Sequence, residues 1–245
     1  MTETMTSQVK ETEEQSNALK KGVIIVGSCG GNDYFGPLVI VAVYASMESL
    51  KWFKTQPFDM SNPLDDMKRN EIVSQVQSRC PFHPVIITPA KYNALFHDMP
   101  SVKEITAWAY ASAISSLLEQ VDCEHAICNG FEKDDVILQR YLNMKRNIVQ
   151  FQVNKKNSLA VASAGIWAEK IYIPCLRNLQ KKYQTRLPRG VGEDVVEPAR
   201  HILKHYDWDG LRNAAKLHMK DMKDIDAVEP AKQTEEQLNN IIPWE

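Results

Sequence analysis

The sequence predicts an α/β fold, in which helices cover a β-sheet. Two short β-branched runs at 22–27 and 37–44 flank a glycine-rich loop, and together they indicate a strand, a loop and a paired strand. Strand-like and helical patterns then alternate along the rest of the chain. That alternation is typical of a sheet with helices packed against it.

The same strand-like and helical patterns of apolar residues predict the other elements. Further strands are expected at 84–88, 125–128 and 148–153. Helices are expected at 65–79, 91–97, 102–121 and 134–144, from Leu159 onward, and, beyond a turn at 187–190, at 194–205 and 208–217. The pattern is clearest in 102–121, where apolar residues at four-three-four spacing form one stripe that we interpret as core packing: Tyr110, Ile114, Leu117 and Val121.

The chain has 245 residues, which is enough for one large domain or two small ones. Its 44% hydrophobic and 24% charged residues are ordinary for a soluble globular protein, so a sizeable core is available. The formal net charge of −2 excludes a strongly basic chain. Any surface for nucleic acid would therefore have to come from local clusters of lysine and arginine.

The five cysteines are odd in number and form no Cys-x-x-Cys pair, which argues against a disulfide framework and against a zinc module. The N-terminus lacks a basic start followed by an apolar run, and no segment is apolar over the length needed to span a bilayer. We therefore expect a cytoplasmic protein that is neither secreted nor bound to a membrane.

Polar segments flank the patterned region. Residues 1–20 are rich in Glu, Thr, Gln and Ser, a composition that buries too little apolar surface to offset the entropy of ordering, so a disordered tail is expected. Residues 223–245 are acidic and polar, and we expect a second tail there. We interpret its apolar end, 238–245, as a local packing latch, with a short motif for a protein partner as the alternative. One domain is therefore expected over 21–222.

The segment 26–37 reads Val-Gly-Ser-Cys-Gly-Gly-Asn-Asp-Tyr-Phe-Gly-Pro. It resembles the opening signature of ribonuclease HIII, whose closing Asp-Tyr-Phe-Gly-Pro is intact here. Further segments resemble the family in the same order: Pro-Ala-Lys-Tyr-Asn at 89–93, Leu-Ala-Val-Ala-Ser-Ala at 159–164, Leu-Pro-Arg-Gly at 187–190 and Ala-Lys-Leu-His-Met at 215–219. The resemblance covers residues 21–222 and implies a ribonuclease H-like mixed β-sheet flanked by helices, with C-terminal helices. The family usually carries an additional N-terminal substrate-binding domain, for which we expect no room before Gly22.

The resemblance implies hydrolysis of RNA/DNA hybrids by two divalent ions, Mg²⁺ or Mn²⁺, held about 4 Å apart. One ion activates the water and the other stabilises the leaving oxygen. Two dications at that distance repel each other strongly, so the family surrounds them with carboxylates, which are also the hard oxygen ligands that magnesium prefers. A chain without those carboxylates is expected not to bind the ions.

The positions that the resemblance assigns to these carboxylates hold other residues. The first two follow Gly-Ser in the opening signature and are Cys29 and Gly30 here, in a loop that is shorter than the family pattern. The third, at the end of a strand, is Asn129, and the fourth, counted back without gaps from Leu159, is Lys155. The formal charge of the site would change from about −4 to about +1. We expect no intact catalytic residue, no bound metal and no cofactor.

Other acidic residues lie near these positions. Asp33 belongs to the family's own signature, where it is not a metal ligand, whereas Glu132, Asp134 and Asp135 follow the strand that ends near Asn129. We interpret the last three as complementing the dipole of the next helix. An active nuclease with relocated ligands is therefore an alternative and not the main hypothesis.

The resemblance also implies residues that bind nucleic acid. The family's Gly-Thr-Gly loop reads ribose 2′-hydroxyls through its backbone amides, and its counterpart here is Gly30, Gly31 and Asn32. The other expected contacts are Tyr34, Lys91, Tyr92, Lys155 and Lys156. Pairs of basic residues lie at 145–146, 155–156, 181–182 and 186/189. They would extend a phosphate-binding surface if the fold places them on one face of the protein. The family's Asp-Ser-Lys segment reads Met-Ser-Asn at 60–62.

Three hypotheses follow. The first is a catalytically inactive ribonuclease HIII-like protein that binds an RNA/DNA hybrid or another nucleic acid, or serves as a non-catalytic subunit. The second is a structural or regulatory protein that binds a protein partner through its tails and does not contact nucleic acid. The third is an active ribonuclease H with relocated metal ligands. The first requires Cys29, Asn129 and Lys155 to converge in the folded chain.

Overall fold

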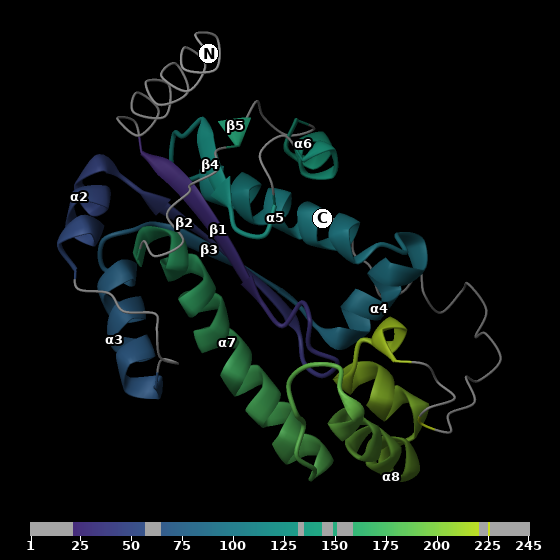
Figure 1. Ribbon diagram of the computed structural model, residues 1–245. Coiled ribbons are helices and arrows are strands. Elements are labelled where there is room, and N and C mark those ends of the chain that lie inside the picture. The colour runs from purple at the N-terminus through teal and green to yellow at the C-terminus, as the bar shows by residue number, and fades with distance from the viewer. Residues whose placement is uncertain are drawn as a thin grey trace, which may run out of the picture.

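A computed structural model describes residues 22–56, 65–131, 135–143, 149–150, 159–220 and 225. In these residues, helices pack on both faces of a five-stranded sheet with the strand order β3-β2-β1-β4-β5 (Figure 1). The strands are β1 (Val23–Cys29), β2 (Leu38–Ala45), β3 (Phe82–Ile87), β4 (His125–Cys128) and β5 (Val149–Gln150). The helices are α2 (Met47–Thr55), α3 (Asp66–Gln77), α4 (Pro89–Asp98), α5 (Val102–Leu118), α6 (Val136–Asn143), α7 (Leu159–Tyr183) and α8 (Val196–Ala214), with short 3-10 turns η2 (Glu193–Val195) and η3 (Leu217–Met219).

The sheet is mixed, as the sequence predicts. Strands β1 and β2 form an antiparallel hairpin, in register from Val23 opposite Ala45 to Cys29 opposite Val39. Strand β3 pairs with β2 in the antiparallel direction, whereas β4 pairs with β1, and β5 with β4, in the parallel direction. Because β1 and β4 are parallel, their carboxyl ends lie at the same edge of the sheet, which is where open α/β sheets commonly bind ligands.

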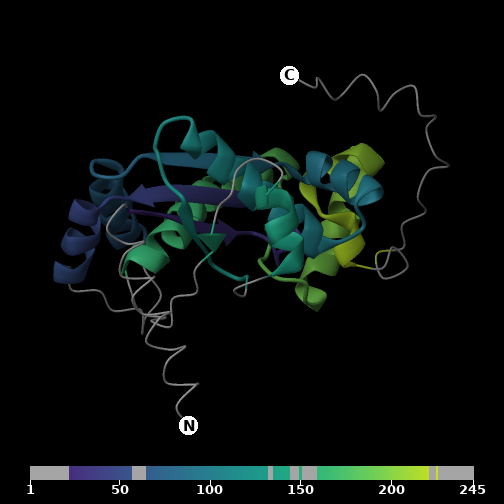
Figure 2. The same ribbon diagram turned by 90° about the horizontal axis from the view of Figure 1, so that it is seen from above.

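Alternate residues of the central strands supply two separate cores. Val23 and Ile25 of β1 belong to the core under α2, α3 and α7, whereas Ile24 and Val26 belong to the core under α5 and α6 (Figure 2). This period of two is expected for strands that are buried on both faces. The apolar stripe predicted for α5 lies in the second core, so its interpretation as core packing is confirmed.

Helix α7 crosses β1 at close range because β1 carries a glycine, Gly27, at the crossing. A Cβ atom added to Gly27 would lie 2.5 Å from the backbone nitrogen of Gly165, a distance that real Cβ atoms do not reach. A glycine within a strand often marks such a close approach of another backbone. The crossing holds the carboxyl end of β1 beneath α7, and it thereby fixes the positions of Ser28 and Cys29.

One region differs from the sequence prediction, and the paired helices near the C-terminal end of the domain agree with it. No helix is predicted where α2 forms, because this short helix buries only Ser49 and Phe53 and so shows no long apolar stripe. It begins where the Ser46 side chain accepts a hydrogen bond from the Ser49 backbone N–H. The two helices expected at 194–205 and 208–217 are confirmed, because α8 consists of two helical segments that meet at a kink at Asp207, whose φ of 58° is not helical.

Several predictions concern residues that the structure does not describe. They are the two tails apart from Ile225, the segment 60–62, Glu132, Asp134, the pair 145–146, Lys155 and Lys156. Within the described ranges, no helix is long and apolar enough to cross a membrane.

Candidate functional site

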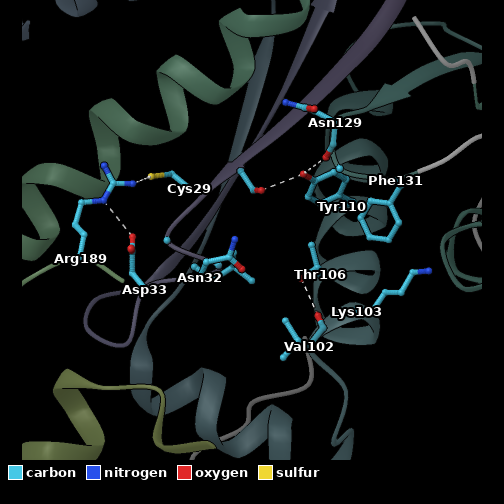
Figure 3. Close-up of a pocket in the computed structure, with 15 residues that line it drawn as sticks. Cys29, Asn32, Asp33, Val102, Lys103, Thr106, Tyr110, Asn129, Phe131 and Arg189 are labelled. Carbon is cyan, nitrogen blue, oxygen red and sulfur yellow. Dashed lines mark hydrogen bonds and ion pairs between the residues drawn. The ribbon is translucent and has the colours of Figure 1, made fainter. Parts of the chain in front are cut away.

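A cleft of about 440 Å³ opens at the carboxyl ends of β1 and β4 (Figure 3). It lies between the loop after β1, the first turns of α5, the turn after β4 and the turn that carries Arg189. The cleft brings together these residues singled out in the sequence: Cys29, Gly30, Gly31, Asn32 and Asn129. The fourth carboxylate position, Lys155, is outside the described residues. Of the positions that the resemblance assigns to metal-binding carboxylates, the first and the third therefore lie together in the folded chain.

Hydrogen bonds join the ends of β1 and β4. The backbone N–H of Asn129 donates to Val26 O at 2.9 Å, so the parallel pairing continues into the turn. From α5, the Tyr110 hydroxyl donates to Asn129 O at 2.7 Å, and its oxygen lies 3.1 Å from Ser28 Oγ. Burial raises the pKa of Tyr110 well above its usual value, so the phenol keeps its proton. The two strand ends are thus joined by neutral groups.

Cys29 carries a neutral thiol at neutral pH. Burial is the largest influence on this group and raises its pKa to about 11, although the charge of Arg189 opposes the shift. Arg189 Nη2 lies 3.5 Å from the sulfur and donates to it. A guanidinium therefore stands beside the position at which the resemblance expects the first metal-binding carboxylate.

Two carboxylates and one ring hold Arg189 in place. Its Nε donates to Asp33 Oδ2 at 3.3 Å, and its Nη1 donates to Glu169 Oε1 at 2.9 Å. The guanidinium carbon lies 5.2 Å from the centre of the Tyr172 ring. Glu169 also accepts from Arg69 Nε at 3.1 Å, so the ion pairs continue from the cleft to α3. Charges of both signs are paired throughout this network.

Lys103 lines the side of the cleft formed by α5 (Figure 3). Its ammonium group lies 2.6 Å from Asp135 Oδ2. The other oxygen, Asp135 Oδ1, accepts from the backbone N–H groups of Ile137 and Leu138 at the start of α6. The sequence interpretation of Asp135 as a residue that complements the α6 dipole is therefore confirmed.

The loop after β1 is clamped by Lys216, a residue to which the sequence analysis gave no role. The Lys216 side chain is fully buried, and its Nζ donates to Asp33 O at 2.6 Å and to Gly36 O at 2.7 Å. Its backbone N–H donates to Tyr34 O at 2.8 Å. Burial lowers the pKa of Lys216 to about 7, against the opposing influence of Asp33. The signal was present, because Lys216 lies in the matched segment 215–219.

A second contact ties that clamp to α4. Asn93 Nδ2 donates to Ala215 O at 2.9 Å and to Arg212 O at 3.0 Å, and Asn93 Oδ1 accepts from the Leu217 backbone N–H at 3.0 Å. On the opposite side of the loop, the Gly190 backbone N–H donates to Asp33 Oδ1 at 2.7 Å. Four of the five segments that carry the resemblance, at 26–37, 89–93, 187–190 and 215–219, thus meet around one loop.

Tyr34 and Tyr92 differ from the sequence prediction. Both were expected to contact nucleic acid, but neither has any exposed surface, because each ring packs inside one of the two cores. Their rings support the loop after β1 and the start of α4. Lys91 is exposed on α4 but does not line the cleft.

The described lining does not match the ligand set that the resemblance implies for two magnesium or manganese ions. Asp33 is the one carboxylate among the described residues that line the cleft. Both of its oxygens are engaged, one by the Gly190 N–H and the other by Arg189. In the part of the chain that the structure describes, no group of three or more His, Cys, Asp or Glu residues is placed to hold a metal ion.

Comparison with known proteins places the chain in a family. The family model described as Ribonuclease HII matches residues 28–222. The chain belongs to the ribonuclease HII family. Among its relatives, Ribonuclease HIII of Protochlamydia amoebophila is 29% identical over 82% of this chain and 67% of its own length, and Ribonuclease HIII of Chlamydia pneumoniae is 30% identical over 82% and 68%. The resemblance to ribonuclease HIII is therefore confirmed.

Solved structures of the family confirm the fold. A structure of Bst-RNase HIII in complex with Mn²⁺ has a TM-score of 0.73 at 22% identity, over 84% of this chain and 69% of that chain. RNase H3 of Aquifex aeolicus has a TM-score of 0.65 at 18% identity, over 86% and 78%. The ribonuclease H-like mixed sheet predicted from the sequence is thus shown.

Proposed function

We propose that this chain is a ribonuclease HIII-like protein that has lost two-metal hydrolysis and acts as a non-catalytic binder of RNA/DNA hybrids or another nucleic acid, or as a non-catalytic subunit. One observation carries the proposal. Cys29, Gly30 and Asn129 lie together at the carboxyl ends of β1 and β4, in the one cleft where the family's first three carboxylates are expected. None of these side chains carries a negative charge at neutral pH.

The charges around the cleft support the loss of metal binding. Two dications a few ångströms apart repel each other, and several carboxylates must offset that repulsion. Here the thiol of Cys29 keeps its proton and has the guanidinium of Arg189 beside it, so a dication at this point would meet a positive charge. The nearby carboxylate of Asp33 already accepts two hydrogen bonds.

The geometry of the loop after β1 supports retained binding. Gly30, Gly31 and Asn32 line the cleft, and the segment that follows them is held by Lys216, which binds the carbonyls of Asp33 and Gly36, and by Gly190, which binds the Asp33 carboxylate. A loop held in one conformation loses little entropy when a ligand binds, which favours affinity. The loop that the family uses to grip nucleic acid is therefore positioned, although its length differs.

We expect no cleavage of an RNA/DNA hybrid in Mg²⁺ or Mn²⁺, because the charge needed to hold two ions is missing. The measurement is a cleavage assay on a labelled hybrid, with an active ribonuclease HIII as the positive control. A gel shift with the same hybrid tests the binding half of the proposal. Metal-dependent turnover that survives stringent purification and disappears in an Asp33→Asn variant would show relocated ligands instead. Absence of any shift with hybrid, RNA or DNA would favour the protein-binding alternative.

A single reversion is not expected to restore cleavage. Groups that act as one catalytic unit are strongly non-additive, so Asn129→Asp alone supplies one carboxylate where several are needed. In Cys29→Asp, the new carboxylate would lie beside Arg189 and form an ion pair with it. The same hybrid assay measures both variants against the unmodified chain. Measurable cleavage by Asn129→Asp alone would mean that fewer ligands are missing than we infer.

A further inference from the structure

Two cationic side chains contribute to the lining of the cleft on opposite sides. Figure 3 shows Arg189, on the turn at 187–190, on one side of the cleft and Lys103, on the first turn of α5, on the other. The Arg189 side chain is 50% exposed and the Lys103 side chain is 56% exposed. Both groups are therefore accessible to a ligand in the cleft.

The carboxylates that pair with these cations are withdrawn from solvent. The Asp33 side chain is 9% exposed and the Asp135 side chain is 8% exposed. Their remaining oxygens accept backbone N–H groups, of Gly190 in one case and of α6 in the other. Glu169, the second partner of Arg189, does not line the cleft. A ligand entering the cleft therefore meets the cations before it meets their partners.

Both cations keep N–H donors that no described residue accepts. A guanidinium has five N–H bonds, and three of those on Arg189 are directed to Asp33, Glu169 and Cys29. An ammonium has three, and one on Lys103 is directed to Asp135. Anchored charges with spare N–H groups are suited to phosphate oxygens, and the guanidinium favours them in particular.

We propose that the cleft binds the sugar-phosphate backbone of a nucleic-acid strand through phosphate contacts to Arg189 on one side and Lys103 on the other, without a divalent ion. This inference rests on the proposed function, because it concerns how the same cleft holds nucleic acid. The resemblance places a cation, Lys155, at the fourth carboxylate position, and that residue is outside the described structure. The geometry of the described residues assigns the role to Arg189 and Lys103.

The test is the salt dependence of hybrid binding by the full chain, measured by fluorescence anisotropy in EDTA and again in Mg²⁺. Each lost phosphate contact lowers the slope of log K against log salt by about one unit, which weakens binding about eightfold at 0.1 M salt. We expect that loss for Lys103→Gln and for Arg189→Gln, and about two units for the double variant. Arg189→Lys keeps the charge and should keep the slope. The matched control is Lys51→Gln, an exposed lysine on α2, which follows β2 at the opposite edge of the sheet.

The outcomes separate this inference from the proposed function. Hybrid binding that is unchanged by EDTA, with reduced slopes only in the cleft variants, supports it. If the unmodified chain binds hybrid but Lys103→Gln has the slope of Lys51→Gln, the phosphate assignment is wrong and the proposed function stands. Binding that requires Mg²⁺ would overturn the metal-free contact. If the unmodified chain binds no hybrid, RNA or DNA at all, both fail. Because Arg189→Gln also removes ion pairs, its stability is measured in parallel, and Lys103→Gln decides the question if that variant does not fold.

Discussion

The Gly30→Ala variant is expected to be about 3 kcal/mol less stable than the unmodified chain and to lose its binding of nucleic acid. Gly30 has a φ of +83°, a backbone conformation that an L side chain rarely adopts. A Cβ atom there would lie 2.2 Å from Pro37 O and 2.7 Å from the Tyr172 ring. The carbonyl cannot move independently of β2, so the loop itself must shift. Urea unfolding measures the stability, and the hybrid gel shift measures the binding.

The adjacent glycine provides a matched control. A Cβ atom added to Gly31 would meet nothing closer than Leu38 Cδ1 at 3.6 Å, which is an ordinary contact. Gly31→Ala is therefore expected to change stability by less than about 1 kcal/mol, because only the backbone entropy of the unfolded chain is altered. Equal losses in the two variants would mean that the loop tolerates no side chain at all, and that the strained φ of Gly30 is not the cause.

Local pattern was enough to predict most of the sheet and its helices. The strand at 125–128 has the predicted bounds, because it is a short apolar run with clear ends that is buried between β1 and β5. The break in α8 also falls between the two predicted helices, at Asp207. Helix α2 was not predicted because it is short and partly exposed. Its formation therefore depends on a cap and on packing against neighbours that are distant in sequence.

The candidate site could be predicted only in part. The convergence of Cys29 and Asn129 follows from a parallel pair of strands, whose carboxyl ends share an edge. The contacts of Arg189 and Lys216 could not be derived from the local pattern, because these residues bind Cys29 and Asp33 from 160 and 183 residues away in the sequence. Only their places in segments that resemble the family marked them. Tyr34 was predicted to contact nucleic acid but is buried, since an aromatic residue in a motif can pack in the core instead of binding a ligand.

Lys216 is expected to make the stability of the chain depend on pH in the alkaline range. Its pKa is lowered by burial to about 7 in the folded chain, whereas a lysine in an unfolded chain has a pKa of about 10.4. Between these values the unfolded state binds the additional proton, so the free energy of unfolding rises with pH. The expected slope is on the order of 1 kcal/mol per pH unit between about pH 7.5 and pH 9.5. Below pH 7 both states are protonated, and this contribution becomes constant.

The Lys216→Met variant isolates this contribution. A neutral amine has two N–H donors, which match the two carbonyls of Asp33 and Gly36, whereas methionine leaves both carbonyls without a partner. We expect a loss of about 3 kcal/mol at pH 9 and a smaller loss at pH 6.5, where the unmodified chain must bury a charge. Urea unfolding of both chains across this range measures the difference, with Lys91→Met, an exposed lysine on α4, as the control. Parallel stability profiles for the unmodified chain and Lys216→Met would show that this lysine keeps its proton, and that its clamp on the loop is an ammonium at every pH tested.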